Sequence, residues 1–205
     1  MRIYVCYFIY SCIMKLALIG NGPISQEQKA EIESYDYVVR LARIDNFCIG
    51  EKMTHLCLDG LGQKSGNPRY KGLLLDISLK NEADVMVFID KNWEFLIDKN
   101  KEMGYVGQSV HFPIENKQKH IKMLQCHNLS LGYKSFLYAK TFDCPVHLYG
   151  FNWHPIMKEY GHNHVNERNT IESSPDVFLH ETPTSNLRDN DIKYTNRRSF
   201  ERHKP

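Results

Sequence analysis

Short apolar runs alternate along the chain with stretches that have the residue spacing of helices. The runs that predict strands cover residues 16–19, 37–41, 55–58, 85–89 and 146–149. Helices are predicted over residues 26–32, where Ser25 and Gln28 form a capping-box pattern, and over residues 93–101, 116–125 and 133–142. This alternation is typical of an α/β domain with a mostly parallel sheet flanked by helices, so we expect a single Rossmann-like domain.

The two ends of the chain differ from this pattern. After Arg2 the first residues are apolar, but residues 3–14 are shorter than the ~20 residues that span a bilayer, and Lys15 interrupts the run. The last segment is polar and charged and predicts a weakly ordered tail. We therefore expect an apolar leader or extension over residues 1–14, the α/β domain over 15–181 and a polar tail over 182–205. A weak association of residues 1–14 with a membrane surface is left open.

Charge and cysteine content narrow the choice of partners. Lys and Arg total 26 against 24 Asp and Glu, so the net charge of +2 does not favour nucleic acid as a partner. Any anionic ligand must be held locally. The 6 cysteines are scattered without a CxxC pair, which excludes a small disulfide-stapled domain and predicts mostly buried thiols.

The segment IGNGPIS contains a glycine turn that follows the first predicted strand and leads into a capped helix. Gly20 and Gly22 allow the backbone to approach a ligand, and the amides of a helix N-terminus suit a phosphate. The alternative is a tight turn without a ligand, because this segment is not the GxGxxG fingerprint.

Two later segments, IESYDYVVRLARI and IGEKMTHLCLDG, extend this turn into a longer pattern. Together with LALIGNG they resemble the long sialylmotif of glycosyltransferase family 29, the sialyltransferases. The matching residues are Gly20, Asn21, Glu33, Ser34, Asp36, Tyr37, Val38, Arg40, Gly50, Lys52, Thr54 and His55. The resemblance implies that Asn21 contacts the donor nucleotide. The family has a second donor-binding asparagine near the position of Ala42, and Asn46 is the expected substitute.

The segment LSLGYKSFLYAKTFDCPVHLYGF resembles the short sialylmotif of the same family. The resemblance implies that backbone groups at its two ends hold the cytidine and the sugar carboxylate, together with Gly20, Asn21 and Gly22. These ends comprise Ser130, Leu131, Gly132, Gly150, Phe151 and Asn152. Animal members bridge a cysteine of this motif to one that begins the long motif. Leu16 occupies that place here, and Cys144 is displaced by one residue, which argues against the usual bridge.

Three histidines, His154, His162 and His164, follow the last predicted core strand, where ligands bind in open α/β sheets. His162 and Glu167 form an H-x-x-x-x-E pattern that resembles the very short sialylmotif, in which the histidine is the catalytic base. A separation of five residues puts the two on different faces of one helix, so we expect His162 to precede the helix and Glu167 to lie in its first turns. From there Glu167 could orient the imidazole or the helix start.

The other two histidines have different expectations. The segment NWH resembles the third sialylmotif, which implies that His154 contacts the departing phosphate. His164 has no assigned role, and a surface position is expected for it. A zinc site is an alternative for the three histidines, but it needs a fourth ligand, and neither Cys144 nor His147 has a recognised spacing.

The resemblance implies a GT-A-like inverting sialyltransferase. Its expected substrates are a CMP donor carrying sialic acid or a related keto-sugar acid and a glycan acceptor, and neither a cofactor nor a metal is expected. Its catalytic residues would be His162, His154 and Glu167. The short chain is expected in the cytoplasm or at a membrane rather than in the Golgi lumen. Two alternatives remain: a catalytically silent CMP-binding protein of this fold, and an unrelated nucleotide-binding α/β enzyme.

Overall fold

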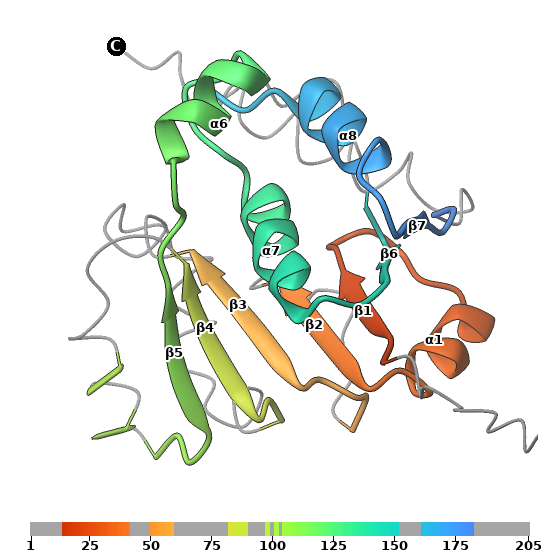
Figure 1. The fold of residues 1–205 in the computed structure, drawn as a ribbon. Helices are drawn as coiled ribbons and strands as arrows, with labels where there is room; N and C mark the ends of the chain where they lie inside the picture. Colours follow the sequence, from red (N-terminus) through yellow and green to blue (C-terminus); the bar gives the residue numbers. More distant parts are fainter. Residues whose placement is uncertain are drawn as a thin grey trace, which may run out of the picture.

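A parallel sheet organises the computed structural model, which describes residues 14–41, 50–59, 82–89, 97–98, 101–102, 104–151 and 161–182. Within these residues the strand order is β5-β4-β3-β2-β1-β6-β7, and every pair is parallel (Figure 1). The strands are β1 (Leu16–Ile19), β2 (Tyr37–Leu41), β3 (His55–Asp59), β4 (Val85–Ile89), β5 (Gln108–Phe112), β6 (Val146–Tyr149) and β7 (Val177–Leu179). The expected Rossmann-like α/β domain is confirmed.

The central strands form where the sequence has continuous apolar runs, because both faces of the sheet are covered. In β1, Leu16 and Leu18 pack into the core beneath α7 (Leu131–Ala139), whereas Ala17 and Ile19 pack on the side of α1 (Gln26–Ile32). All four residues of β1 are buried. The five predicted strands agree with the structure to within one residue at their ends.

The two outer strands, β5 and β7, were not predicted. The β5 segment QSVHF has only partly buried and exposed residues, and β7 has 3 residues, of which two are exposed. Edge strands lack the second neighbour and the double-sided burial that produce a continuous apolar run. The sequence pattern therefore carries no strong signal for them.

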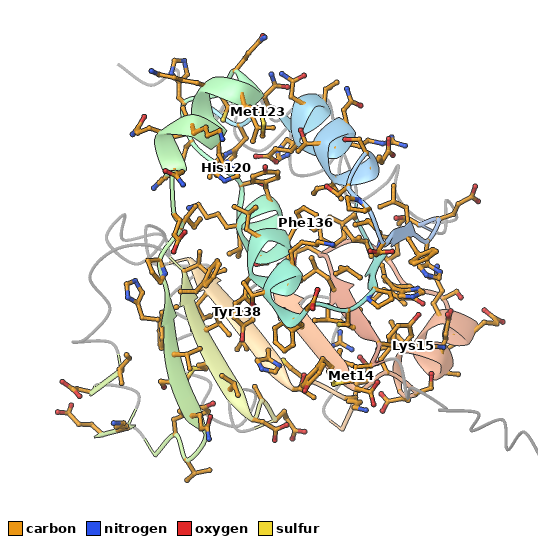
Figure 2. The ribbon with its side chains drawn as sticks, in the orientation of Figure 1. Met14, Lys15, His120, Met123, Phe136 and Tyr138 are labelled. Carbon is orange, nitrogen blue, oxygen red and sulfur yellow. The ribbon has the colours of Figure 1, made fainter. Side chains whose placement is uncertain are left out.

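Four helices accompany the described sheet: α1, α7, α6 (Lys117–Leu124) and α8 (His164–Glu172). Figure 2 shows Phe136 and Tyr138 extending from α7 over the strands. The Tyr138 ring centroid lies 5.2 Å from that of Phe112 in β5. Aromatic contacts of this kind add to the area that α7 buries against the sheet.

Helix boundaries differ from the prediction where capping decides them. Helix α7 begins at Leu131, two residues before the predicted start, because the Ser130 side chain caps it by accepting from the Tyr133 amide. Its predicted last turn is the 3-10 helix η1 (Lys140–Phe142). The predicted helix over residues 93–101 lies mostly outside the described residues, although residues 97–98 are helical.

The strand order reverses direction at β1. The chain moves from β1 through β2, β3 and β4 to β5, and then returns to the other side of β1 to form β6 (Figure 1). The carboxyl ends of β1 and β6 therefore flank the topological switch point, which is where open α/β sheets bind ligands.

The expectations for the chain ends lie outside the described residues, apart from Met14 and Thr182. In the described part of the chain no helix is long and apolar enough to cross a membrane. Cys57, Cys126 and Cys144 are free thiols, and the first and last of these are buried, as expected.

A pair of histidines joins β6 to the chain after β7. His147 Nδ1 lies 3.0 Å from His180 Nε2, and the His180 ring stacks on Tyr149 with centroids 4.0 Å apart. Burial lowers the pKa of both imidazoles, and the neighbouring His180 lowers that of His147 further. The folded state therefore favours the neutral form of both rings.

This pair predicts a loss of stability in acid. The unfolded chain, with histidine pKa values of about 6.5, binds more protons than the folded chain, so stability falls as the pH drops from about 7 to 5. His180→Phe keeps a ring over Tyr149 and removes one of these groups, and we expect its urea midpoint to fall less over this range. His127→Gln, at an exposed histidine, should keep the wild-type dependence. Equal dependence in all three proteins would contradict the prediction.

Candidate functional site

The glycine turns after β1 and β6 pack directly against each other. The Gly20 amide donates to the Tyr149 carbonyl at 2.7 Å, and the Gly22 amide donates to the Gly150 carbonyl at 2.7 Å. A Cβ on Gly20 would lie 2.4 Å from the Gly150 oxygen, and Gly150 itself has φ +64°. Close approach of two backbones thus requires these glycines, whether or not a ligand is bound.

The start of α7 joins the two turns at the switch point. The Phe151 ring lies against Gly20 and Gly132, and a Cβ on Gly132 would be 3.2 Å from that ring. Leu131 and Gly132 are the first two residues of α7, so their amides have no acceptor within the helix. Asn21 is exposed between two buried glycines. The structure therefore brings together three segments that the long and short motifs predicted for donor binding.

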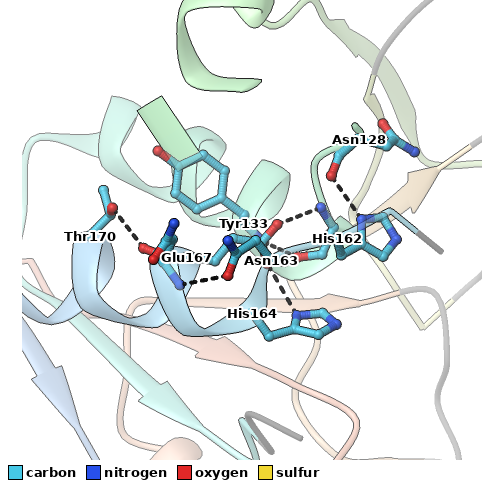
Figure 3. A network of polar contacts seen from close by, with 9 residues as sticks. Asn128, Tyr133, His162, Asn163, His164, Glu167 and Thr170 are labelled. Carbon is cyan, nitrogen blue, oxygen red and sulfur yellow. Dashed lines mark hydrogen bonds and ion pairs between the residues drawn. The ribbon is translucent and has the colours of Figure 1, made fainter. Parts of the chain in front are cut away.

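The Glu167 carboxylate, in the first turns of α8, is a buried charge of this region. It is fully buried and accepts three hydrogen bonds: Oε1 from the Ser130 amide at 2.9 Å, and Oε2 from the Ser130 hydroxyl at 2.6 Å and from His164 Nδ1 at 3.2 Å (Figure 3). A buried carboxylate needs such donors to offset its desolvation. Because Ser130 caps α7, these bonds fix α8 against the start of α7.

His162 precedes α8, as predicted, and is held by the backbone. Its Nδ1 lies 2.9 Å from the Asn128 carbonyl oxygen. The Gly161 carbonyl accepts from the amides of His127 and Asn128 at 2.8 and 3.2 Å, which fixes the segment before the helix. Since a carbonyl only accepts, Nδ1 of a neutral His162 carries the proton, and Nε2 keeps its lone pair.

Glu167 pairs with His164 rather than with His162. The expected roles for this carboxylate were to orient the His162 imidazole or the start of its own helix. The hydrogen bonds of Glu167 go instead to Ser130, which caps α7, and to His164, the first residue of α8. The expectation of a surface His164 is wrong, because its side chain is 19% exposed and is paired with a fully buried carboxylate. The two imidazole centroids are 5.6 Å apart.

Three predicted site residues, Asn46, Asn152 and His154, lie outside the described residues. Within the described part, no group of three or more His, Cys, Asp or Glu side chains could hold a metal ion.

Most polar residues of the long-motif match hold the sheet rather than face the switch point. Asp36 accepts from the Lys15 amide, Glu33 accepts from the Lys52 amide, and the Thr54 hydroxyl contacts both backbone groups of Val38. The Lys52 ammonium donates to the Tyr35 carbonyl. His55 is buried at the amino end of β3, where burial lowers its pKa. These residues join the segments that enter β1, β2 and β3 at the amino end of the sheet, whereas the glycine turns lie at its carboxyl end.

Three residues beside the site, His120, Asn128 and Tyr133, were not singled out from the sequence. His120, which extends from α6 (Figure 2), contacts the Tyr133 hydroxyl at 3.1 Å. Burial together with the nearby Glu167 raises the pKa of Tyr133 to about 12. Asn128 contributes a backbone carbonyl, for which no residue-type signal exists. Tyr133 lies on an apolar face of its helix, so the sequence pattern predicts only that it packs in the core.

Comparison with known proteins leaves the family open. No protein-family model matches the chain, and no curated protein matches it significantly.

The contact between the turns predicts that a methyl group added at Gly20 lowers the stability of the fold. In Gly20→Ala the Cβ would meet the Gly150 carbonyl oxygen, so the free energy of unfolding should fall by about 1–3 kcal/mol. Gln118→Ala, at an exposed position of α6, is the control and should change the free energy of unfolding little. Urea unfolding measures both. A Gly20→Ala protein as stable as the wild type would show that the turns do not pack in this way.

The Glu167 network predicts a difference between two glutamates of α8. Glu167→Gln replaces an acceptor of three hydrogen bonds in a buried position, so unfolding should become about 1–3 kcal/mol easier. Glu172→Gln removes a partly exposed pair with Arg168 and should cost less than about 0.5 kcal/mol. Chemical denaturation separates the two, and similar losses would refute a special role for Glu167.

Proposed function

We propose that the protein is an inverting glycosyltransferase that moves sialic acid, or a related keto-sugar acid, from a CMP donor to a hydroxyl of a glycan acceptor. The observation that carries this proposal is the Ser130–Glu167 contact, which joins the glycine turns at the switch point to the histidines that begin α8. A transferase needs its donor pocket and its base at a fixed separation. This contact supports the proposal because it fixes the start of α7 relative to the start of α8.

The donor side is assigned to the three segments at the switch point. Backbone amides of Leu131 and Gly132 are suited to the phosphate of CMP, and the exposed Asn21 is suited to the cytidine. The negative charge of the departing phosphate is thereby held by amide dipoles. The family resemblance also assigns His154 to this phosphate, and that residue lies outside the described ones.

The acceptor side is assigned to the start of α8. An imidazole nitrogen there takes the proton of the acceptor hydroxyl while its oxygen bonds to the anomeric carbon from the face opposite the phosphate. The bond from that carbon to the phosphate oxygen breaks, and its electron pair leaves with CMP. One displacement inverts the anomeric centre.

A further observation supports the family resemblance. The sialyltransferase pattern has a cysteine at position 16 that bridges to the short-motif cysteine. Here Leu16 pairs in register with Val146 and belongs to the same buried cluster as Cys144. The position at which the family has its first cysteine therefore lies in the same buried cluster as the Cys144 thiol.

The proposal is tested by nucleotide binding. CMP should raise the melting temperature, whereas UDP and NAD should not, because binding stabilises the folded state by mass action. Asn21→Ala should weaken CMP affinity about two- to tenfold, the equivalent of one hydrogen bond. The exposed Asn169, on the far part of α8, gives the matched control, Asn169→Ala, with unchanged affinity.

Turnover then separates the candidates. Release of CMP from CMP-sialic acid with a glycan acceptor, unaffected by EDTA, is the expected result. Binding of CMP without turnover under any acceptor would leave a silent nucleotide-binding protein. Stabilisation by NAD alone would overturn the proposal.

A further inference from the structure

Two imidazoles at the start of α8 could act as the base, and their chemical environments differ. His162 and His164 both have Nδ1 within hydrogen-bond distance of an acceptor, so both offer a lone pair at Nε2 when neutral. The acceptor for His162 is a backbone carbonyl, and the acceptor for His164 is the carboxylate of Glu167.

We propose that His164, oriented by Glu167, is the general base, and that His162 is a positioning residue. The inference rests on the proposed function and changes the residue that the H-x-x-x-x-E pattern selects. His164 and Glu167 are three residues apart on α8, so they share a face, whereas His162 and Glu167 are five apart.

The charge that forms on proton uptake favours His164. When a base takes a proton from the acceptor hydroxyl, its ring becomes a cation, and a neighbouring carboxylate stabilises that cation more than a carbonyl dipole does. Glu167 is fully buried, so water screens this attraction little. The Asn128 carbonyl offers His162 no comparable charge.

Glu167 is itself held in place independently of the imidazole. The amide and the hydroxyl of Ser130 both donate to it, which favours the ionised carboxylate and fixes its orientation. Glu167 therefore holds both the proposed base and the start of α7. The position of Nε2 relative to the proposed donor pocket is set by short bonds rather than by a loop.

The His164 ring is also placed to reach a substrate. It extends from the start of α8 with Nδ1 turned toward Glu167 (Figure 3), and 19% of the side chain is exposed. This exposure leaves part of the ring open to solvent, whereas the carboxylate of Glu167 is fully buried. The hydroxyl proton moves to Nε2, the hydroxyl oxygen bonds to the anomeric carbon, and the pair of electrons of the broken bond leaves on the CMP phosphate.

His162 has a different task. Its hydrogen bond to Asn128, together with the contacts of the Gly161 carbonyl, ties the segment before α8 to the segment before α7. Loss of its ring should loosen this connection and lower the rate through displacement of His164.

Variants of the full chain test this assignment by turnover and by CMP affinity. His164→Ala should lower kcat about 10²- to 10⁴-fold while CMP affinity stays within about twofold. His162→Ala should lower kcat by less than about tenfold. Added imidazole should restore part of the activity of His164→Ala and none of that of His162→Ala. His111→Ala, at an exposed position of the edge strand β5, is the control with unchanged activity.

A spectroscopic readout tests the geometry without turnover. Nitrogen-15 spectra of the histidine rings should show His164 as the Nδ1–H tautomer in the wild type and as a mixture of tautomers in Glu167→Gln, while His162 stays the same in both. An Nε2–H tautomer for His164 in the wild type would overturn the inference, as would full loss of turnover in His162→Ala with little loss in His164→Ala. A wild type that binds CMP and turns over leaves the proposed function intact in either case. A wild type that binds no CMP removes both.

Discussion

The buried carboxylate of Glu167 is the interaction on which the candidate site depends. An isolated charge in this position would be strongly unfavourable, and the three donors from Ser130 and His164 make it tolerable. Because the donors come from different elements, satisfying one charge fixes two helices and one imidazole at once. Ser130 is also the cap of α7, so one residue both begins a helix and donates hydrogen bonds to a buried charge on another helix.

The sheet explains why this contact lies where a ligand would bind. The order β2-β1-β6 puts the carboxyl ends of β1 and β6 side by side, and α7 runs back over the sheet so that its first residues lie at the same edge. The glycines there are required by the close approach of two turns, and the polar residues in the segments that enter β2 and β3 bond to the backbone. Many residues of the segments that resemble the sialylmotifs therefore stabilise the fold. Among the described residues, the groups best placed for a ligand are the exposed Asn21, the first amides of α7 and the histidines at the start of α8.

The sequence predicts the parts of this structure that follow from local patterns. Buried parallel strands appear as apolar runs, and the Ser25–Gln28 capping box marks α1, which begins and ends where expected. The edge strands were not predicted because half of their surface is solvated. Helix α7 starts earlier than predicted because Ser130 caps it within a segment whose sequence is typical of a turn. The partner of Glu167 could not be predicted, since Ser130 is 37 residues away and the contact exists only once α7 and α8 pack. Sequence spacing favoured His162, whereas the fold turns the carboxylate toward His164.

The same carboxylate joins stability and chemistry, which limits what any one substitution can reveal. Removal of Glu167 releases Ser130 and His164 together, so a lost activity would not show whether the cap or the imidazole was responsible. Residues that share a network are not additive, and their separate contributions emerge only when each partner is changed alone and then both. The Ser130 side acts through the position of α7 and should appear in nucleotide affinity. Under the proposed function, the His164 side acts through proton transfer and should appear in the rate of the bound complex. Nucleotide affinity and the rate of the bound complex therefore measure the structural and the electrostatic role of this buried charge separately.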